Sequence, residues 1–203
     1  VWLLHSKYIR RDRAFLERKI MEFSESGESG IWITTQIVEA SLDIDFDILY
    51  TEMCTADSLL QRMGRCNRKG RYFPEEANVI IYDNRNGVGK NGIYDSVMYD
   101  RSLKLLAQYE NLEFVESMKT IYMNQVYDSD EIKGTGYYEE IEKCLNKLSE
   151  IHPVDYKLKD AEIRKINSVT VVPEEIYQEK MDLFECGTDF LRKSNVSKET
   201  KSL

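Results

Sequence analysis

Residues 31–63 constrain the fold more than any other part of the chain, because two apolar segments and a helix follow one another with short connections. The first segment, 31–38, is rich in β-branched residues and is predicted to form a buried strand, and 48–51 has the same character. Residues 56–58 supply an N-cap for a helix that continues through Gln61. Strand, polar loop, strand and helix in this order predict an α/β fold with a mainly parallel sheet.

Polar residues that follow the predicted strands are expected to lie at one edge of the sheet. In parallel α/β folds, ligands bind at the carboxyl ends of the strands, where Thr35, Ser41 and Asp43 should project. Asp43, Asp45 and Asp47 alternate with apolar residues, which raises a metal site as one interpretation. Since no His or Glu completes a ligand set, no metal site is assigned.

The segment Leu60–Gly70 concentrates cationic side chains around a glycine. Gln61, Arg65 and Arg68 are spaced i, i+4 and i+7, which predicts one polar stripe on a helix. Gly64 would let a ligand or another backbone come close. Two guanidiniums at a fixed spacing suit a polyphosphate whose charge grows in a transition state. A solvated basic helix end explains the same residues about as well.

Two of these segments together resemble motifs of superfamily 2 helicases. Thr34–Asp45 is similar to motif V, and Gln61–Arg68 is similar to motif VI, Q-R-x-G-R-x-x-R. Residues 2–6 resemble the strand that carries motif IV. Within the superfamily, E-A-S-L-D-I-D-F-D followed by Q-R-x-G-R-x-N-R resembles the CRISPR-associated helicase-nuclease of type I systems. The resemblance covers residues 2–70 and implies that residues 1–84 are part of a second RecA-like helicase lobe.

The resemblance implies a role for each matching residue. Arg65 and Arg68 would contact the γ-phosphate of ATP, with Arg68 as the arginine finger that acts across the cleft between two lobes. Gln61 would help to hold the nucleotide, and Asp43 would accept a hydrogen bond from its ribose. The residues implied to line the phosphates of single-stranded DNA are His5, Ser6, Thr34 and Thr35. Whichever threonine points into the sheet is equally well explained as a strand residue.

By this account the chain holds half of an ATPase site. It has no G-x-x-x-x-G-K-[ST] phosphate loop, and no Asp-Glu pair ends an apolar strand ahead of motif V. The residues that hold ATP and Mg²⁺ are therefore expected on a first lobe outside this chain, and the fragment alone is expected to be inactive. The other implied partners are that first RecA-like lobe and an HD nuclease domain of the same full-length protein, together with the CRISPR surveillance complex.

Residues 85–203 are expected to form a linker and a mainly helical accessory region. Apolar residues recur there at helical spacing, and Pro153 should end one of the helices. The expected elements are helices around 103–109, 114–122, 137–151 and 174–191, a short strand at 169–172 and a disordered tail at 192–203.

Composition limits the remaining classes. No apolar run approaches the ~20 residues that span a bilayer, so the protein is expected to be cytoplasmic and free of a membrane partner. The net charge of −8 argues against a protein surface that is basic throughout, as in many nonspecific nucleic-acid binders. Most of the acidic excess, however, lies after residue 75. A translocating motor needs only a local basic groove, for which residues 10–13 are candidates, although these equally suit a solvated helix face. The four cysteines form no C-x-x-C pair, which disfavours zinc.

The chain is therefore interpreted as the second motor lobe of an ATP-dependent DNA helicase or translocase that acts in CRISPR antiviral defence. A lobe of another superfamily 2 DNA helicase, from repair or restriction, is the alternative within the same class. A catalytically idle lobe that binds a partner is the alternative from another class. The joint presence of Gln61, Arg65 and Arg68 argues against an idle lobe, because a retired ATPase site need not keep both arginines.

Overall fold

The computed structural model describes residues 1–39, 42–90, 92–149 and 171–185. The chain divides into two compact units, Val1–Asn146 and Lys147–Leu203. In the described part, no helix is both long enough and apolar enough to cross a membrane.

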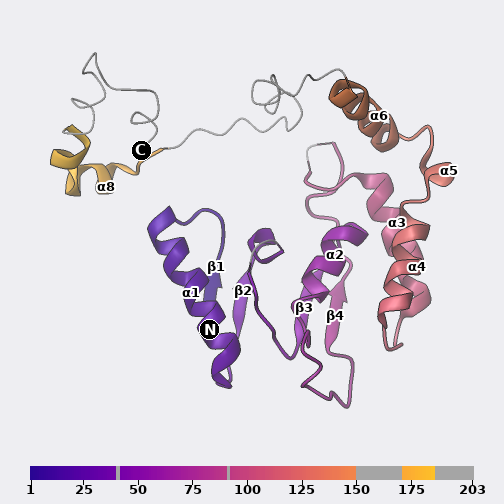
Figure 1. Cartoon of the computed structure of the whole chain (residues 1–203), viewed down its shortest axis with the longest axis horizontal. Coiled ribbons are helices and arrows are strands. Elements are labelled where there is room, and N and C mark those ends of the chain that lie inside the picture. The colour runs from indigo at the N-terminus through magenta and orange to yellow at the C-terminus, as the bar shows by residue number, and fades with distance from the viewer. Residues whose placement is uncertain (40–41, 91, 150–170, 186–203) are drawn as a thin grey trace. The chain divides into compact units, whose positions relative to one another are not determined.

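Four short strands of the first unit form two parallel pairs (Figure 1). β1 (Trp2–Leu4) pairs with β2 (Trp32–Thr34), and β3 (Leu49–Glu52) pairs with β4 (Val79–Tyr82). The parallel pairing that the sequence predicted is confirmed for both pairs. Each connection between paired strands contains a helix, as parallel strands require.

The strand β2 is shorter than the predicted strand at 31–38. It ends at Thr34, and a 3₁₀ helix, η1 (Gln36–Val38), follows after one residue. Ile37 and Val38 pack in this turn against the apolar cluster that Leu4 and Ile44 help to form. An apolar run too short to show its period does not distinguish a strand from a buried turn, which explains the difference.

The helix α1 (Arg10–Ser26) lies beside β1 and β2 (Figure 1). Ile20 on its inner face is fully buried and packs with Leu4 and Leu42 in one core cluster. The helix ends at Gly27, whose φ of 71° is the left-handed geometry that favours glycine at this position.

The helix α2 (Ala56–Met63) packs on a second core cluster through Leu59, together with Met53 and Tyr99. Its first backbone N–H, that of Ala56, donates to the Ser102 hydroxyl at 3.0 Å. The helix stops before Gly64. The predicted helical stripe through 61–68 is therefore wrong, because Arg65 and Arg68 lie in the turn that follows α2.

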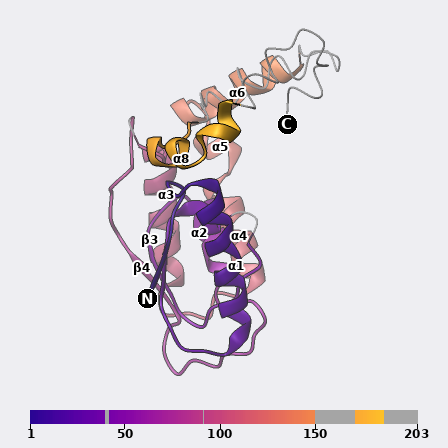
Figure 2. The ribbon, with the colours of Figure 1, turned by 90° about the vertical axis from the view of Figure 1, so that its left-hand side faces the viewer.

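The region after β4 is mostly helical, as predicted. Its elements are α3 (Ser96–Leu106), η2 (Ala107–Tyr109), α4 (Glu116–Val126), α5 (Ser129–Ile132) and α6 (Gly136–Ser149). Met98, Tyr122 and Val126 form a third core cluster that also contains Ala56 of α2, and Figure 2 shows α2, α3 and α4 close together. The Tyr127 hydroxyl adds a 2.6 Å hydrogen bond to Asp57.

The domain boundary at 84/85 stays a prediction, although α3 and α4 pack directly on α2. In the second unit, α8 (Glu174–Glu179) and residues 181–185 are helical, as predicted for the first part of 174–191. Val171 and Val172 lie outside any strand. The rest of the predicted strand, Pro153 and the tail 192–203 lie outside the described residues.

Candidate functional site

The turn after α2 carries the two arginines predicted to bind phosphate. Its backbone is held by the loop before β3, because the Phe46 N–H donates to the Arg65 carbonyl at 2.9 Å and the Phe46 carbonyl accepts the Asn67 N–H at 2.7 Å. Asn67 adopts a left-handed φ of 47°, a conformation that Asn tolerates better than most residues. Its side-chain amide closes the turn by exchanging two hydrogen bonds with the backbone of Tyr72, at 2.8 and 3.0 Å.

Arg68 is brought together with Asp43, which was predicted to act on the same nucleotide. The Arg68 guanidinium lies 2.5 Å from Asp43 Oδ1, and the two side chains are 48% and 82% exposed. The Asp45 carboxylate accepts the backbone N–H groups of Arg68 and Lys69, at 2.6 and 3.1 Å. Because an exposed ion pair contributes only about 0–1 kcal/mol, the Arg68 guanidinium can exchange Asp43 for a phosphate.

Arg65 lies deeper than Arg68. One terminal nitrogen of its guanidinium donates to the Glu39 carbonyl at 3.0 Å. Its buried Nε has no hydrogen-bond partner within the part of the chain that the structure describes. Gln61 is in the last turn of α2, with its side chain exposed.

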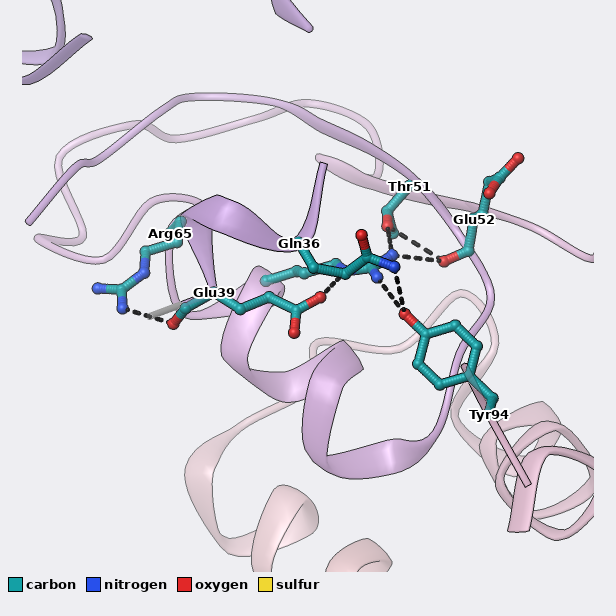
Figure 3. A network of polar contacts seen from close by, with 7 residues as sticks. Gln36, Glu39, Thr51, Glu52, Arg65 and Tyr94 are labelled. Atoms are coloured by element: carbon teal, nitrogen blue, oxygen red, sulfur yellow. Dashed lines mark hydrogen bonds and ion pairs between the residues drawn. The ribbon is translucent and has the colours of Figure 1, made fainter. Parts of the chain in front are cut away.

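Arg62 is the residue that the sequence reasoning missed. It donates from Nε to Glu39 Oε1 at 2.7 Å and from Nη2 to the Tyr94 hydroxyl at 2.7 Å. Nη1 donates to Thr51 Oγ1 at 3.0 Å and to the Glu52 carbonyl at 3.2 Å. Figure 3 shows these partners around one point, with Gln36 beside Tyr94. The Arg62 and Glu39 side chains are only 15% and 12% exposed, so this ion pair is largely buried.

Burial also shifts the ionisation of groups near Arg62. Burial raises the pKa of the Cys54 thiol to about 11, although the positive charge of Arg62 acts in the opposite direction. The pKa of Tyr94 is raised as well, mainly by burial. Burial lowers the pKa of Arg62, but Cys54 and Glu39 outweigh it and the net pKa is raised. At neutral pH the site therefore contains a charged guanidinium, a neutral thiol and a neutral phenol.

The residues predicted to follow DNA phosphates gather at one edge of the β1–β2 pair. Leu4 and Thr34 are register partners at the ends of the two strands, and the Thr35 N–H donates to the Leu4 carbonyl at 3.3 Å. Ser6 and Thr35 are therefore on the same carboxyl edge, and both are exposed. Thr34 is half-buried, which agrees with a partly structural role for that threonine.

His5 is also at this edge, and it is half-buried. Its ring stacks on Tyr8 with centroids 4.2 Å apart, and its Nδ1 accepts the Lys7 N–H at 3.0 Å. Ser41, expected at the same edge, lies outside the described residues.

Within the described residues, no three His, Cys, Asp or Glu side chains are grouped closely enough to hold a metal ion. Among the three aspartates considered for such a site, Asp43 and Asp45 accept hydrogen bonds from the turn at 68–69.

Comparison with known proteins places these motifs in a family. The family model described as CRISPR-associated nuclease/helicase Cas3, C-terminal, matches residues 1–71. The CRISPR-associated nuclease/helicase Cas3 of Methanothermobacter thermautotrophicus is 32% identical over 161 residues, which is 77% of this chain and 19% of that protein. This chain is related to the carboxy-terminal part of Cas3. The match to this relative spans about a fifth of that protein's length.

Solved Cas3 structures agree in fold with this Cas3-related chain. The match to the crystal structure of T. fusca Cas3-ATP covers 85% of this chain and 22% of the T. fusca chain, with a TM-score of 0.55 and 21% sequence identity. The match to a chain in the structure described as CRISPR RNA-guided surveillance complex, pre-nicking, covers 86% of this chain and 22% of that chain. Its TM-score is 0.51 and the sequence identity is 22%. The predicted truncated RecA-like lobe with a helical region after it is therefore confirmed as the fold.

Proposed function

We propose that this chain supplies the second motor lobe of an ATP-dependent DNA helicase or translocase in CRISPR antiviral defence. The observation that carries the proposal is the placement of Arg65 and Arg68 on a turn held beside the loop of Asp43. Two guanidiniums fixed in this way suit a γ-phosphate whose charge grows during transfer. Arg68 is the arginine finger, Arg65 is the second phosphate contact, and Gln61 helps to hold the nucleotide.

Asp43 has two successive partners in this proposal. It holds the Arg68 guanidinium through an exposed ion pair, which costs little to break. When the γ-phosphate takes Arg68, the Asp43 carboxylate becomes free to accept a hydrogen bond from the ribose. The pair therefore keeps Arg68 near the position at which it acts.

The DNA contacts are proposed for the carboxyl edge of β1 and β2. Hydroxyls of Ser6 and Thr35 are exposed there, and His5 and Thr34 are beside them. Hydroxyl and backbone donors position a phosphate backbone without reading its sequence. An uncharged binding edge also suits single-stranded DNA that has to be released at each step, since every cation would strengthen the binding of a phosphate.

The remaining components are proposed to come from outside this chain. ATP with Mg²⁺ is the cofactor, and a first RecA-like lobe provides the phosphate loop and the metal-holding acid. The similar T. fusca Cas3 has been crystallised with ATP, which supports the nucleotide. An HD nuclease domain and a CRISPR surveillance complex are the other proposed partners, and the similarity to a chain of such a complex supports the second of these.

Arg68→Ala in the complete motor tests this function. ATP turnover stimulated by DNA should fall by roughly 10³-fold or more, as expected for the loss of an arginine finger, while affinity for single-stranded DNA stays within about twofold. Arg68→Lys should fail nearly as badly, because an ammonium does not reproduce the planar guanidinium fork. Lys69→Ala is the matched control, since it removes the neighbouring cation and should keep parental turnover. Equal, small losses in Arg68→Ala and Lys69→Ala would show that Arg68 is only a surface cation of the turn after α2.

A further inference from the structure

The Tyr94 hydroxyl connects the two halves of the proposed site. It accepts one hydrogen bond from Arg62 Nη2 at 2.7 Å and another from Gln36 Nε2 at 3.3 Å (Figure 3). Gln36 directly follows Thr35 at the DNA edge, and Arg62 precedes Arg65 by three residues. One phenol oxygen thus bridges the segment proposed to hold DNA and the helix that leads to the phosphate-binding turn.

The path continues from Arg62 to Arg65 through a single residue. The buried Arg62 guanidinium holds the Glu39 carboxylate at 2.7 Å, and the Arg65 guanidinium holds the carbonyl of the same Glu39 at 3.0 Å. Arg62 and Arg65 therefore hold two groups of one residue, the side chain and the backbone carbonyl of Glu39. Because the Arg62–Glu39 pair is largely buried, separating its members would leave a buried charge without its partner, so a shift of one favours a shift of the other.

The loop that carries Tyr94 is built to hold its ring in one place. The Gly87 carbonyl accepts the N–H groups of both Ile93 and Tyr94, at 2.7 and 3.1 Å, and the Gly89 N–H donates to the Tyr94 carbonyl at 2.9 Å. A Cβ atom at Gly92 would lie only 2.1 Å from the Gly87 carbonyl oxygen, so this close crossing of the chain requires glycine. These hydrogen bonds fix the backbone at Tyr94, and the Tyr94 side chain packs against the core cluster that contains Met53 and Leu59.

We propose that Tyr94 is a positioning residue that couples the DNA edge to the phosphate-binding arginines, through Gln36 on one side and through Arg62 and Glu39 on the other. The proposal rests on the proposed function and adds to it a residue outside the motifs that the chain shares with helicases. DNA that shifts the Thr35–Gln36 segment changes the hydrogen bonds at the Tyr94 hydroxyl, and Arg62 transmits the change to Arg65. The link acts on the response of the ATPase to DNA.

Tyr94→Phe in the complete motor removes this hydroxyl and keeps the ring that the loop holds. ATP turnover is measured at saturating ATP with and without single-stranded DNA, and the ratio of the two rates is the readout. The ratio should fall about five- to tenfold, the lower range of coupling between two sites. Gln36→Ala, at the exposed end of the link, should lower it similarly. The double variant should be no worse than either single variant, because both changes break the same link.

Tyr50→Phe is the matched control, since this tyrosine is 64% exposed on β3 and should keep the parental ratio. A Tyr94→Phe variant with the parental ratio, or losses that multiply in the double variant, would overturn the coupling role while leaving the proposed function intact. A parent enzyme without DNA-stimulated turnover would overturn the proposed function, and the coupling role with it. An equal fall of the ratio in Tyr94→Phe and Tyr50→Phe would also overturn the coupling role, because loss of any tyrosine hydroxyl would then have the same effect.

Discussion

At the scale of single residues, the contact between Tyr127 and Asp57 shows how an exposed carboxylate is tuned by its neighbours. Burial by itself raises the pKa of the Asp57 carboxyl, but hydrogen bonds from Tyr127 and Thr55 outweigh it, and the net pKa is lowered. The pKa of the Tyr127 hydroxyl is raised, by burial and by its bond to Asp57. The two shifts agree, since a phenol that donates to a carboxylate stabilises the ionised acid and the neutral phenol.

Tyr127→Phe should therefore raise the pKa of Asp57 in the folded protein. A depressed carboxyl pKa stabilises the fold above the unfolded value of about 3.9, and this stabilisation is lost as the pH falls through the folded pKa. The variant should lose about 1 kcal/mol of unfolding free energy at pH 7, and less near pH 3. NMR titration of Asp57 and urea unfolding at both pH values measure these effects. Tyr137→Phe, whose ring is 6.4 Å from that of Tyr127, is the control, and an unchanged Asp57 pKa in Tyr127→Phe would contradict the account.

Residue chemistry at the site was only partly predictable from the sequence. Arg68 and Asp43 were both assigned to the nucleotide, and they do lie together. Arg62 lies in the cationic segment 60–70 but was assigned no role, because its partners come from segments whose meeting is decided by tertiary packing. Tyr94 was missed for the same reason, since a glycine-rich stretch indicates a turn and does not indicate which side chain the turn delivers.

At the scale of elements, the ends of β1 and β2 decide which side chains share an edge. Parallel register places Leu4 opposite Thr34, so the residues that follow both strands emerge on the same side of the sheet. Ser29 precedes β2 and is on the opposite, amino edge of the same pair. This arrangement provides two exposed hydroxyls on the proposed DNA edge and a third one away from it.

Ser6→Ala and Thr35→Val in the complete motor should each weaken single-strand binding about three- to twentyfold. The range corresponds to the loss of one hydrogen bond, worth about 0.5–1.5 kcal/mol or slightly more when the acceptor is a charged phosphate. Titrations with homopolymer and mixed-sequence strands at several salt concentrations should show equal losses for every sequence. The salt dependence should stay the same, because no cation is removed.

Ser29→Ala should leave the binding of single-stranded DNA unchanged. If both edge variants bind like Ser29→Ala, or if their losses depend on the DNA sequence, these hydroxyls do not lie on the DNA track.

Element types were predicted better than element ends. Parallel strands, α1 and the helices after β4 follow from apolar spacing, and the structure contains them. The end of α2 at Gly64 was not predicted, because the spacing of Gln61, Arg65 and Arg68 fits a continuing helix equally well. The turn after Gly64 is held by a tertiary contact, the backbone bridge between Phe46 and Cys66, which the spacing of these three residues does not reveal.

At the scale of the whole molecule, the chain supplies arginines without a phosphate loop. Its sequence lacks the G-x-x-x-x-G-K-[ST] pattern that would cradle the β- and γ-phosphates. Under the proposed function, Arg65 and Arg68 have no positioned phosphate on which to act without that cradle and its metal ion. The proposed reaction then depends on the first lobe, brought against this one.

The purified 203-residue chain should therefore hydrolyse no ATP above background, with or without single-stranded DNA. Phosphate release is the measurement, and adding the first lobe in trans or in the same polypeptide should restore turnover. The Arg68→Ala chain, recombined with that lobe, is the control for contaminating ATPase. Robust turnover by the isolated chain that Arg68→Ala abolishes would refute the half-site account.

The Arg62 contacts also determine when this region acquires its final form as the chain folds. Their partners are separated from Arg62 by 10 to 32 residues in sequence. Contacts at such separations form after local ones, because closing the intervening loop costs entropy before the contact contributes. The helices α1 and α2 can therefore form early, while the cluster around Arg62 is completed late. On the ribosome, Arg62 Nη2 and Gln36 Nε2 cannot meet their shared acceptor until Tyr94 has emerged, so the contacts that join the two halves of the site wait for the most distant residue in sequence.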